Sequence, residues 1–522
     1  MRKNACRKHE RGMALILVLL ALLLVSAVGL GMIYMSTTET SINTNYKDTQ
    51  LAFFAMRGGL EEMRDRMRSD SLQPIPALAF PLIPASMPGT AANSIVYITN
   101  PSLGENVDPE TFGNTFFDDE FCHEHFTAVG PVTPVGTPCI AAGAPPAGSV
   151  AQPYVASMSP NTGTLGSLKY KWARITMKQN GTFQVGATAA GLVDPGQGIA
   201  SPVCWDAFAY QERVASAMGG SADCATAVAN GFNVQPLYLI TSMAITPSGS
   251  RRIGQYEVAS FNVAAPPSGL TLDGPPAAAD FNPPSSTNAV VDGVDGSYPT
   301  KPGSHWIAPP PVAGCNPNTG NHAAIGVDNA AAQAVVTAQI SKPDNYQGLN
   351  WVPTVTPSVV PLPLLGTNNW SNPTMLNNLA SEMANVADVT CPGSAMCSSS
   401  TYGTDTSPQI TYVNGDFTMG SGTSGAGVLV VTGNFTINGK MEYDGLILVI
   451  GQGSVTVSGA GDGTIFGELF VGNTNGAVGG VLGPPSFTWN GGGSAGVYYN
   501  SCWAAVGNNL HYMVVASREE MY

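Results

Sequence analysis

The densest group of metal-binding side chains is Cys122-His123-Glu124-His125, which follows three acids at 118–120. Zinc sites usually use two pairs of Cys or His ligands at short spacing, and no second pair follows. We therefore favour a disulfide at Cys122 with solvated neighbours, with metal binding as the alternative. Asp292 and Asp295 resemble the start of a calcium loop but lack its twelfth-position glutamate, which favours a plain turn. We expect no metal and no cofactor.

Eight cysteines follow the N-terminal leader, and an even number in an exported chain predicts disulfides. They are Cys122, Cys139, Cys204, Cys224, Cys315, Cys391, Cys397 and Cys502. Short loops close at low entropic cost, which favours Cys122–Cys139, Cys204–Cys224 and Cys391–Cys397. Cys315 and Cys502 then pair by elimination or stay free. We expect at least three disulfides.

Catalytic patterns are sparse in this chain. No G-x-S-x-G, H-E-x-x-H or P-loop pattern occurs. A polysaccharide-cleaving enzyme would need carboxylates or a basic residue gathered in one groove. The C-terminal block offers Asp416, Glu442, Asp444, Asp462, Glu468 and one basic residue, Lys440. We expect no catalytic residues and a protein that is not an enzyme.

Composition narrows the classes of partner. The 522 residues carry a formal net charge of −14, only 11% of them are charged, and Gly and Pro number 60 and 40. An acidic chain of low charge density argues against nucleic-acid binding. Abundant glycine and proline favour turns and β structure.

One long helix organises the N-terminus. The segment Met13–Met35 holds 23 residues without a charge, long enough to span a bilayer. The leader before it carries Arg2, Lys3, Arg7, Lys8 and Arg11 against Glu10, which places the N-terminus in the cytoplasm. An ordinary secretory signal has a shorter apolar region, of roughly 7–15 residues.

The helix pattern continues beyond the apolar segment. No proline occurs from Met1 to Gln73, and apolar residues step by three and four. The stripe is Ile42, Tyr46, Phe53, Met56, Leu60, Met63 and Met67. The pattern predicts one continuous helix from Met13 to about Arg68. Four arginines among three acids near its end predict a solvated face with ion pairs four residues apart.

These features resemble a type IV prepilin. A basic leader that ends at Gly12 resembles a class III signal peptide, which implies cleavage between Gly12 and Met13 by prepilin peptidase. The stretch NYKDTQLAFFAMRGGLEEMRDRM resembles the N-terminal region of PilX-type minor pilins. The family often has Glu where this chain has Arg57. Major pilins have Glu at the fifth residue after cleavage, and here that residue is Leu17.

The rest of the chain is rich in strand patterns. Residues 94–99, 168–178 and 237–263 read as strands, with hairpin turns at Asn180-Gly181 and at 247–250. Residues 328–341 and 373–388 read as helices. YVNGDFTM (412–419) recurs as VVTGNFTI (430–437), and looser echoes follow at 18–22 residues. This repeat predicts coils of a parallel β-solenoid, with strands at 428–431 and 446–450 buried on both faces.

The predicted fold class is therefore α+β: a long N-terminal pilin helix with an antiparallel β head, plus a C-terminal all-β, parallel solenoid-like domain. We expect five segments: a prepilin leader (1–12), the transmembrane and pilin helix (13–70), a pilin-like α+β head (71–265), a Pro/Ala-rich connector with short helices (266–405) and a β-solenoid-like domain (406–522).

The resemblance implies a structural minor pilin of a type IV pilus, probable partners being other pilins, the pilus assembly machinery and a surface ligand. Its assembly helix would use Leu17, Ile42, Tyr46, Phe53, Met56 and Leu60. It would sit in the inner membrane before assembly and in the extracellular pilus afterwards. Because Leu17 cannot neutralise the N-terminal amine of a subunit ahead of it, we expect a place at the tip and a role in initiation. The alternatives are a tip pseudopilin of a type II secretion system and a membrane-anchored, glycan-binding adhesin.

Overall fold

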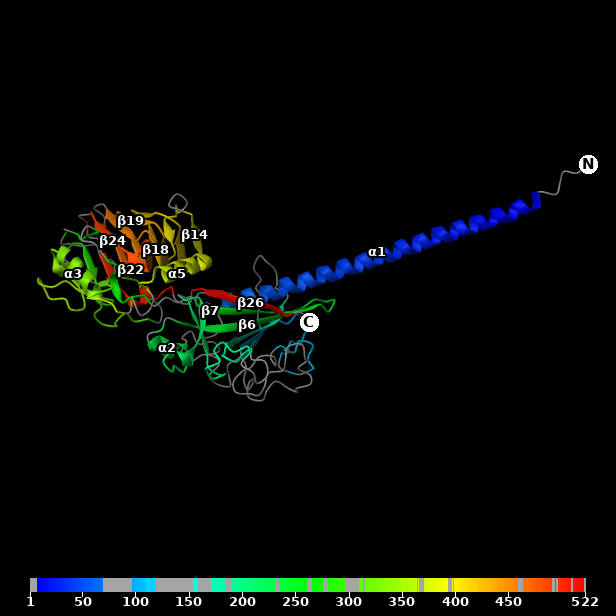
Figure 1. The fold of residues 1–522 in the computed structure, drawn as a ribbon, viewed down its shortest axis with the longest axis horizontal. Helices are drawn as coiled ribbons and strands as arrows, with labels where there is room; N and C mark the ends of the chain where they lie inside the picture. Colours follow the sequence, from blue (N-terminus) through cyan, green and yellow to red (C-terminus); the bar gives the residue numbers. More distant parts are fainter. Residues whose placement is uncertain are drawn as a thin grey trace, which may run out of the picture.

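The computed structural model describes residues 7–68, 96–120, 154–157, 170–183, 190–260, 265–296, 309–312 and 315–520, apart from short gaps within some of these ranges. The molecule consists of a long helix, a head sheet at its end and a second, larger sheet domain beyond the head (Figure 1). The fold is α+β, with a long N-terminal helix and sheet-rich domains, as the sequence predicts.

Helix α1 (Arg7–Arg66) is unbroken for 60 residues, about 90 Å at 1.5 Å per residue. The absence of proline allows this continuity, and the prediction of one continuous helix is confirmed. The N-terminal part of α1 extends away from the rest of the molecule, and its C-terminal part lies on the head (Figure 1).

The head is a sheet of eight strands in the order β2-β1-β3-β6, with β7 and β26 continuing on one branch and β4 and β5 on another. Its strands are β1 (Val96–Thr99), β2 (Tyr154–Ser157), β3 (Tyr170–Met177), β4 (Val203–Asp206), β5 (Gln211–Val214), β6 (Gln235–Ile245), β7 (Arg251–Ser260) and β26 (Tyr512–Glu520). The pairs are antiparallel except β1–β2, which is parallel. The short helix α2 (Cys224–Ala229) follows β5.

One predicted hairpin is confirmed and the other is wrong. Strands β6 and β7 pair in antiparallel fashion on either side of the turn at 247–250. The turn at Asn180-Gly181 does not return the chain beside β3, which pairs with β1 and β6 instead. The reason is that the buried Asn180 side chain is bonded to a later loop, through the backbone of Asp194 and the carbonyl oxygen of Gln197.

Residues 268–510 form what we call the parallel-sheet domain. It contains a 13-stranded sheet and a five-stranded sheet, and every described strand pair in them is parallel except the β22–β23 hairpin. Its strands are β8 (Ser268–Asp273), β9 (Phe281–Asn282), β10 (Val290–Asp292), β11 (Ala323–Val327), β12 (Tyr346–Gln347), β13 (Val359–Pro361), β14 (Val389–Cys391), β15 (Thr401–Tyr402), β16 (Gln409–Val413), β17 (Phe417–Gly420), β18 (Ser424–Val431), β19 (Asn434–Asn438), β20 (Glu442–Ile450), β21 (Ser454–Ser458), β22 (Thr464–Val478), β23 (Val481–Gly483), β24 (Ser486–Trp489) and β25 (Gly496–Tyr499). Its helices are α3 (Ala330–Gln339), α5 (Pro373–Val386) and α6 (Ser501–Ala504), and α3 and α5 match the two helices that the sequence predicts.

The sequence repeat sets the strand register. Ile410 lies opposite Val428, and Val428 opposite Leu446, each 18 residues further on. In the five-stranded sheet Phe417 lies opposite Phe435. The step lengthens where the β22–β23 hairpin is inserted, so that Val455 lies opposite Phe487.

The longer strands of the 13-stranded sheet are buried on both faces, as their apolar runs predict. On one face Leu429, Val431 and their neighbours pack against the five-stranded sheet. On the other face Val428, Val430 and their neighbours pack against α5. The domain therefore has a core on each side of its larger sheet.

The structure corrects the predicted boundaries. Strand β26, which we expected in the C-terminal domain, pairs with β7 in the head, and Figure 1 shows it beside β7. The predicted connector 266–405 is also not a linker, because β8, β10, β11, β12 and β13 belong to the 13-stranded sheet. The parallel-sheet domain is thus inserted between two neighbouring strands of the head.

Candidate assembly helix and head junction

The first half of α1 is exposed and apolar. From Met13 to Met35 every large apolar side chain is exposed, including Leu17 at 67%. Within the described part of the chain, α1 is the one helix long and apolar enough to cross a membrane. This half therefore requires an apolar environment that the isolated subunit does not supply, which is compatible with membrane anchoring.

The second half of α1 packs on the head. Met56, Leu60, Met63 and Met67 are buried against side chains of β3, β6 and β7. Gly59 permits this approach, because a Cβ there would lie 2.3 Å from the Ser242 hydroxyl. The stripe that the sequence predicts is therefore divided between two environments.

The division falls within the predicted assembly residues. Met56 and Leu60 are buried, and Phe53 is partly buried at the edge of the core. Ile42 and Tyr46 are 61% and 65% exposed, because the head begins to cover the helix only near Ala52. Sequence periodicity alone did not indicate where this coverage starts.

The charged end of α1 is more buried than we predicted. Arg66 pairs with Glu62 at 2.9 Å, and both side chains are only about a tenth exposed. Arg64 pairs with Glu61 at 2.7 Å and remains more exposed. The expected pairs form, but the head excludes solvent from part of this face.

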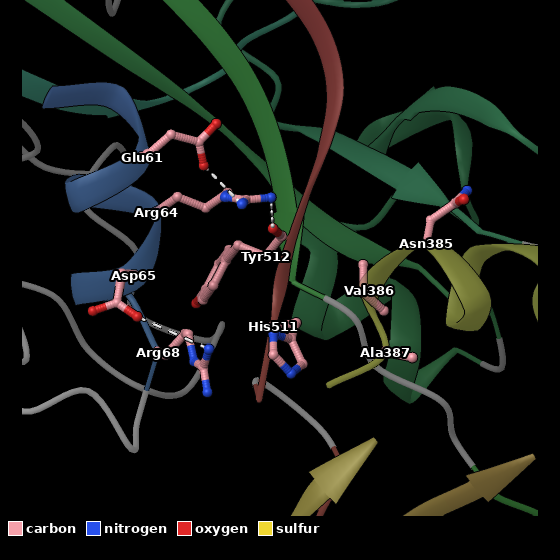
Figure 2. Close-up of a pocket in the computed structure, with 9 residues that line it drawn as sticks. All are labelled: Glu61, Arg64, Asp65, Arg68, Asn385, Val386, Ala387, His511 and Tyr512. Atoms are coloured by element: carbon pink, nitrogen blue, oxygen red, sulfur yellow. Dashed lines mark hydrogen bonds and ion pairs between the residues drawn. The ribbon is translucent and has the colours of Figure 1, made fainter. Parts of the chain in front are cut away.

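A pocket of about 290 Å³ lies where α1, α5 and the start of β26 meet. Figure 2 shows Arg64 reaching from α1 to the carbonyl oxygen of Tyr512, at 3.4 Å. On the other side His511 lies 3.0 Å from Asp388, which follows α5. Burial alone would raise the pKa of Asp388, but hydrogen bonds from His511 and from the Ile410 N–H hold it below its usual range. The pocket thus joins the head to the parallel-sheet domain.

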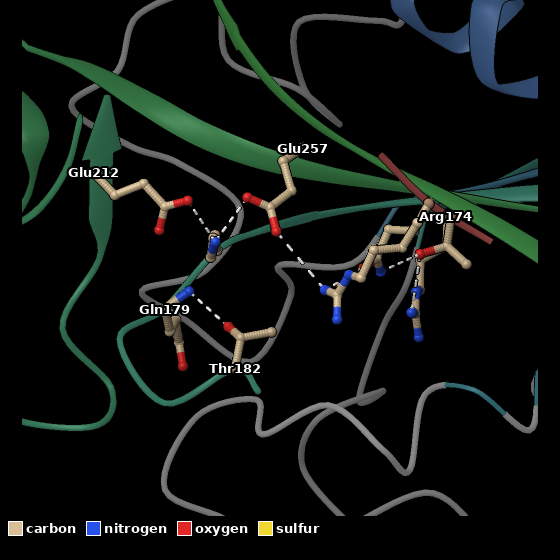
Figure 3. Close-up of polar contacts among 9 residues, drawn as sticks. Arg174, Gln179, Thr182, Glu212 and Glu257 are labelled. Carbon is tan, nitrogen blue, oxygen red and sulfur yellow. Dashed lines mark hydrogen bonds and ion pairs between the residues drawn. The ribbon is translucent and has the colours of Figure 1, made fainter. Parts of the chain in front are cut away.

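A buried ionic network ties the last strand to the head. The Lys178 ammonium donates to Glu212 at 2.8 Å and to Glu257 at 2.7 Å, and Figure 3 shows the two carboxylates converging. Arg518 of β26 lies 3.8 Å from Glu257 and donates to Gln255 at 2.8 Å. Burial raises the pKa of Glu212, although Lys178 acts in the opposite direction. Sequence reasoning missed this network because its members lie far apart in the chain.

Three of the expected disulfides are present: Cys204–Cys224, Cys391–Cys397 and Cys315–Cys502. Cys122 and Cys139 lie outside the described residues, as does the group 122–125. Among the described residues no three His, Cys, Asp or Glu side chains are placed to hold a metal ion. The Asp295 carboxylate accepts hydrogen bonds from the backbone and hydroxyls of Thr319 and Ser501, so it fastens a turn.

The acids of the parallel-sheet domain do not line one groove. Glu468 is fully buried and accepts a hydrogen bond from Thr271. Asp444 is 3% exposed, and burial, reinforced by Glu442 and Asp405, raises its pKa to about 8. Asp416 lies at an exposed turn and binds the backbone and side chain of Asn434. Asp462 lies outside the described residues.

Comparison with known proteins addresses the helix. Residues 11–55 match the family described as PilX N-terminal. The chain carries a PilX N-terminal domain. The match covers the exposed part of α1 and ends where the head begins to bury the helix. Neither the curated proteins nor the solved structures contain a match to this chain.

Proposed function

We propose that the protein is a structural minor pilin of a type IV pilus, acting through contact rather than catalysis. The observation that carries the proposal is the division of α1 into an exposed apolar half and a half buried in the head. The PilX N-terminal domain supports it. Lipid would surround the exposed half before assembly, and the helices of neighbouring subunits would replace it in the filament.

Processing follows from the same proposal. Prepilin peptidase would cut between Gly12 and Met13, where the basic leader ends and the uncharged segment begins. N-terminal sequencing of the mature protein should read from Met13. A mature protein that begins at Met1 would contradict this step.

We further propose that the subunit occupies the filament tip and takes part in initiation. No acidic residue occurs between Met13 and Thr38, so the buried part of the filament would receive no carboxylate from this chain. An unpaired ammonium among packed apolar helices is costly, and a tip subunit need not neutralise one ahead of it. The size of the parallel-sheet domain supports the same place, since it would crowd the shaft.

The parallel-sheet domain would be a solenoid-like display platform for surface contact. Supporting this, successive strands in both sheets pair at steps that begin at 18 residues. Its buried acids fit a packing role. We propose that it binds a surface ligand without turning it over.

The test is the place of the protein in sheared filaments. Gold-labelled antibody against residues 409–510 should mark filament ends at low copy number. Leu17→Glu should impair initiation or admit the subunit to the shaft, and the control Leu17→Ile should leave both unchanged. Labelling along the whole shaft would contradict a tip position, and absence from sheared filaments would contradict the minor-pilin assignment.

A further inference from the structure

The five-stranded sheet has an exposed face of unusual chemistry. Its strands alternate strictly, and the inward residues are buried in the core shared with the larger sheet. The outward residues are Thr418, Gly420, Asn434, Thr436, Asn438, Ser454, Thr456, Ser458, Ser486, Thr488 and Asn282. We call this set the hydroxyl face. It lies on the opposite side of the core from the face that α5 covers, on the side of β19 and β24 (Figure 1).

The hydroxyl face is built in register. Thr418, Thr436, Thr456 and Thr488 lie opposite one another in successive strands, and Asn282 continues the row. A second row runs from Asn434 through 454 to 486. Neighbouring strands are about 4.8 Å apart, and outward residues of one strand about 7 Å apart. The face is therefore a regular lattice of hydrogen-bonding groups.

The lattice carries no charge and its threonines are free to bind. None of its outward residues is acidic or basic, although the whole chain has a formal net charge of −14. In the described part of the chain, no intramolecular hydrogen bond uses the hydroxyl of Thr418, Thr436, Thr456 or Thr488. A charge-free surface on an acidic protein matches a neutral ligand better than an anionic one.

Strand propensity alone explains only part of this pattern. Threonine is favoured in strands, and cross-strand Thr pairs stabilise sheets. Asparagine, however, is depleted in strands, yet Asn282, Asn434 and Asn438 all lie on this face. Edge strands also commonly carry lysine as protection against aggregation, and β17 and β9 present none here. Propensity and protection therefore leave the amides and the missing charges unexplained.

We propose that the hydroxyl face binds a neutral polysaccharide. Such a polymer presents hydroxyl groups at a repeating spacing together with C–H surfaces. Threonine offers a hydroxyl and a methyl group at each lattice point, and the amides add donors and acceptors. The proposal deepens the surface contact of the proposed function, and it rests on that function only for display on a filament.

The test uses the full-length protein in detergent, mixed with microcrystalline cellulose or chitin. We expect depletion of the protein from solution by at least one of them, but not by the anionic polysaccharide alginate. Thr436→Val with Thr456→Val keeps β-branched side chains and removes two hydroxyls, so binding should weaken about tenfold. The control Thr390→Val changes an exposed strand threonine off the face and should bind like the parent.

A second variant guards against misfolding. Thr436→Lys should abolish binding while the melting temperature stays close to that of the parent. Undiminished binding by the double valine variant, no depletion by either neutral polysaccharide, or retention only in growing ice crystals would overturn the proposal. Binding by purified protein that is absent from filaments would sink the pilin assignment and leave this inference standing.

Discussion

The head and the parallel-sheet domain are built from the chain in opposite ways. In the parallel-sheet domain Val428 pairs with Leu446, one coil further along. In the head β7 and β26 are neighbours although the whole parallel-sheet domain separates them in sequence. Local repetition can be read from a sequence, whereas closure of a sheet over a long insertion leaves little local signal. The comparison predicts that the two regions respond differently to mutation.

The largest contrast concerns disulfides within the parallel-sheet domain. Cys315 and Cys502 are 187 residues apart, and Cys391 and Cys397 only 6. The loop-entropy model gives about 5 and 2 kcal/mol for these loops. Cys315→Ser should therefore lower the free energy of unfolding by about 3 kcal/mol more than Cys391→Ser, measured by denaturant unfolding. Equal losses would show that loop closure does not dominate.

In the head, the ionic network should be the sensitive feature. Lys178→Met leaves Glu257 buried without its ammonium partner, which should cost about 3–5 kcal/mol. Lys171→Met is the matched control, since its partner Glu105 is more exposed. Thermal unfolding should show loss of the head transition in the first variant alone. A loss confined to the parallel-sheet transition would contradict the assignment of β26 to the head.

The two halves of α1 should differ in the same manner. Leu60→Ala removes a buried side chain and should cost about 2–5 kcal/mol. Ile42→Ala, at an exposed position, should change stability by less than about 0.5 kcal/mol but reduce incorporation into filaments. Denaturant unfolding and quantification of sheared filaments measure the two effects. Normal incorporation of Ile42→Ala would exclude that residue from the assembly surface.

The smallest effect concerns pH in the parallel-sheet domain. Asp444 has a pKa raised to about 8, above the usual 3.9 for an unfolded chain. Its contribution to stability is full below about pH 4 and is lost as pH rises through about 8. The loss is at most about 1.4 kcal/mol per pH unit. Asp444→Asn should flatten this dependence in melting experiments between pH 5 and 9, and an unchanged slope would show that Asp444 is solvated.

The sequence predicted what local patterns determine. Apolar periodicity without proline gave α1, and the repeat at 412–437 gave the parallel register. It did not place β26, because alternation in residues 512–520 fits either sheet. It also could not assign β8 and β10, whose short strands lie within Pro- and Ala-rich sequence. Among the candidate residues, Leu17 was predicted to be unpaired in the helix, but the exposure of Ile42 and Tyr46 depends on where the head begins.

The central claim is that a pilin helix and head form one module into which a display domain is inserted. Ser260 lies opposite Tyr512, so a two-residue Asn-Gly turn in place of residues 261–511 would convert β7 and β26 into a hairpin. The measurement is cooperative melting of this excision variant together with its recovery in sheared filaments. We predict that it folds, enters the membrane and reaches filaments, but no longer binds polysaccharide. A head that fails to fold without the parallel-sheet domain, although the hairpin is closed, would contradict the account.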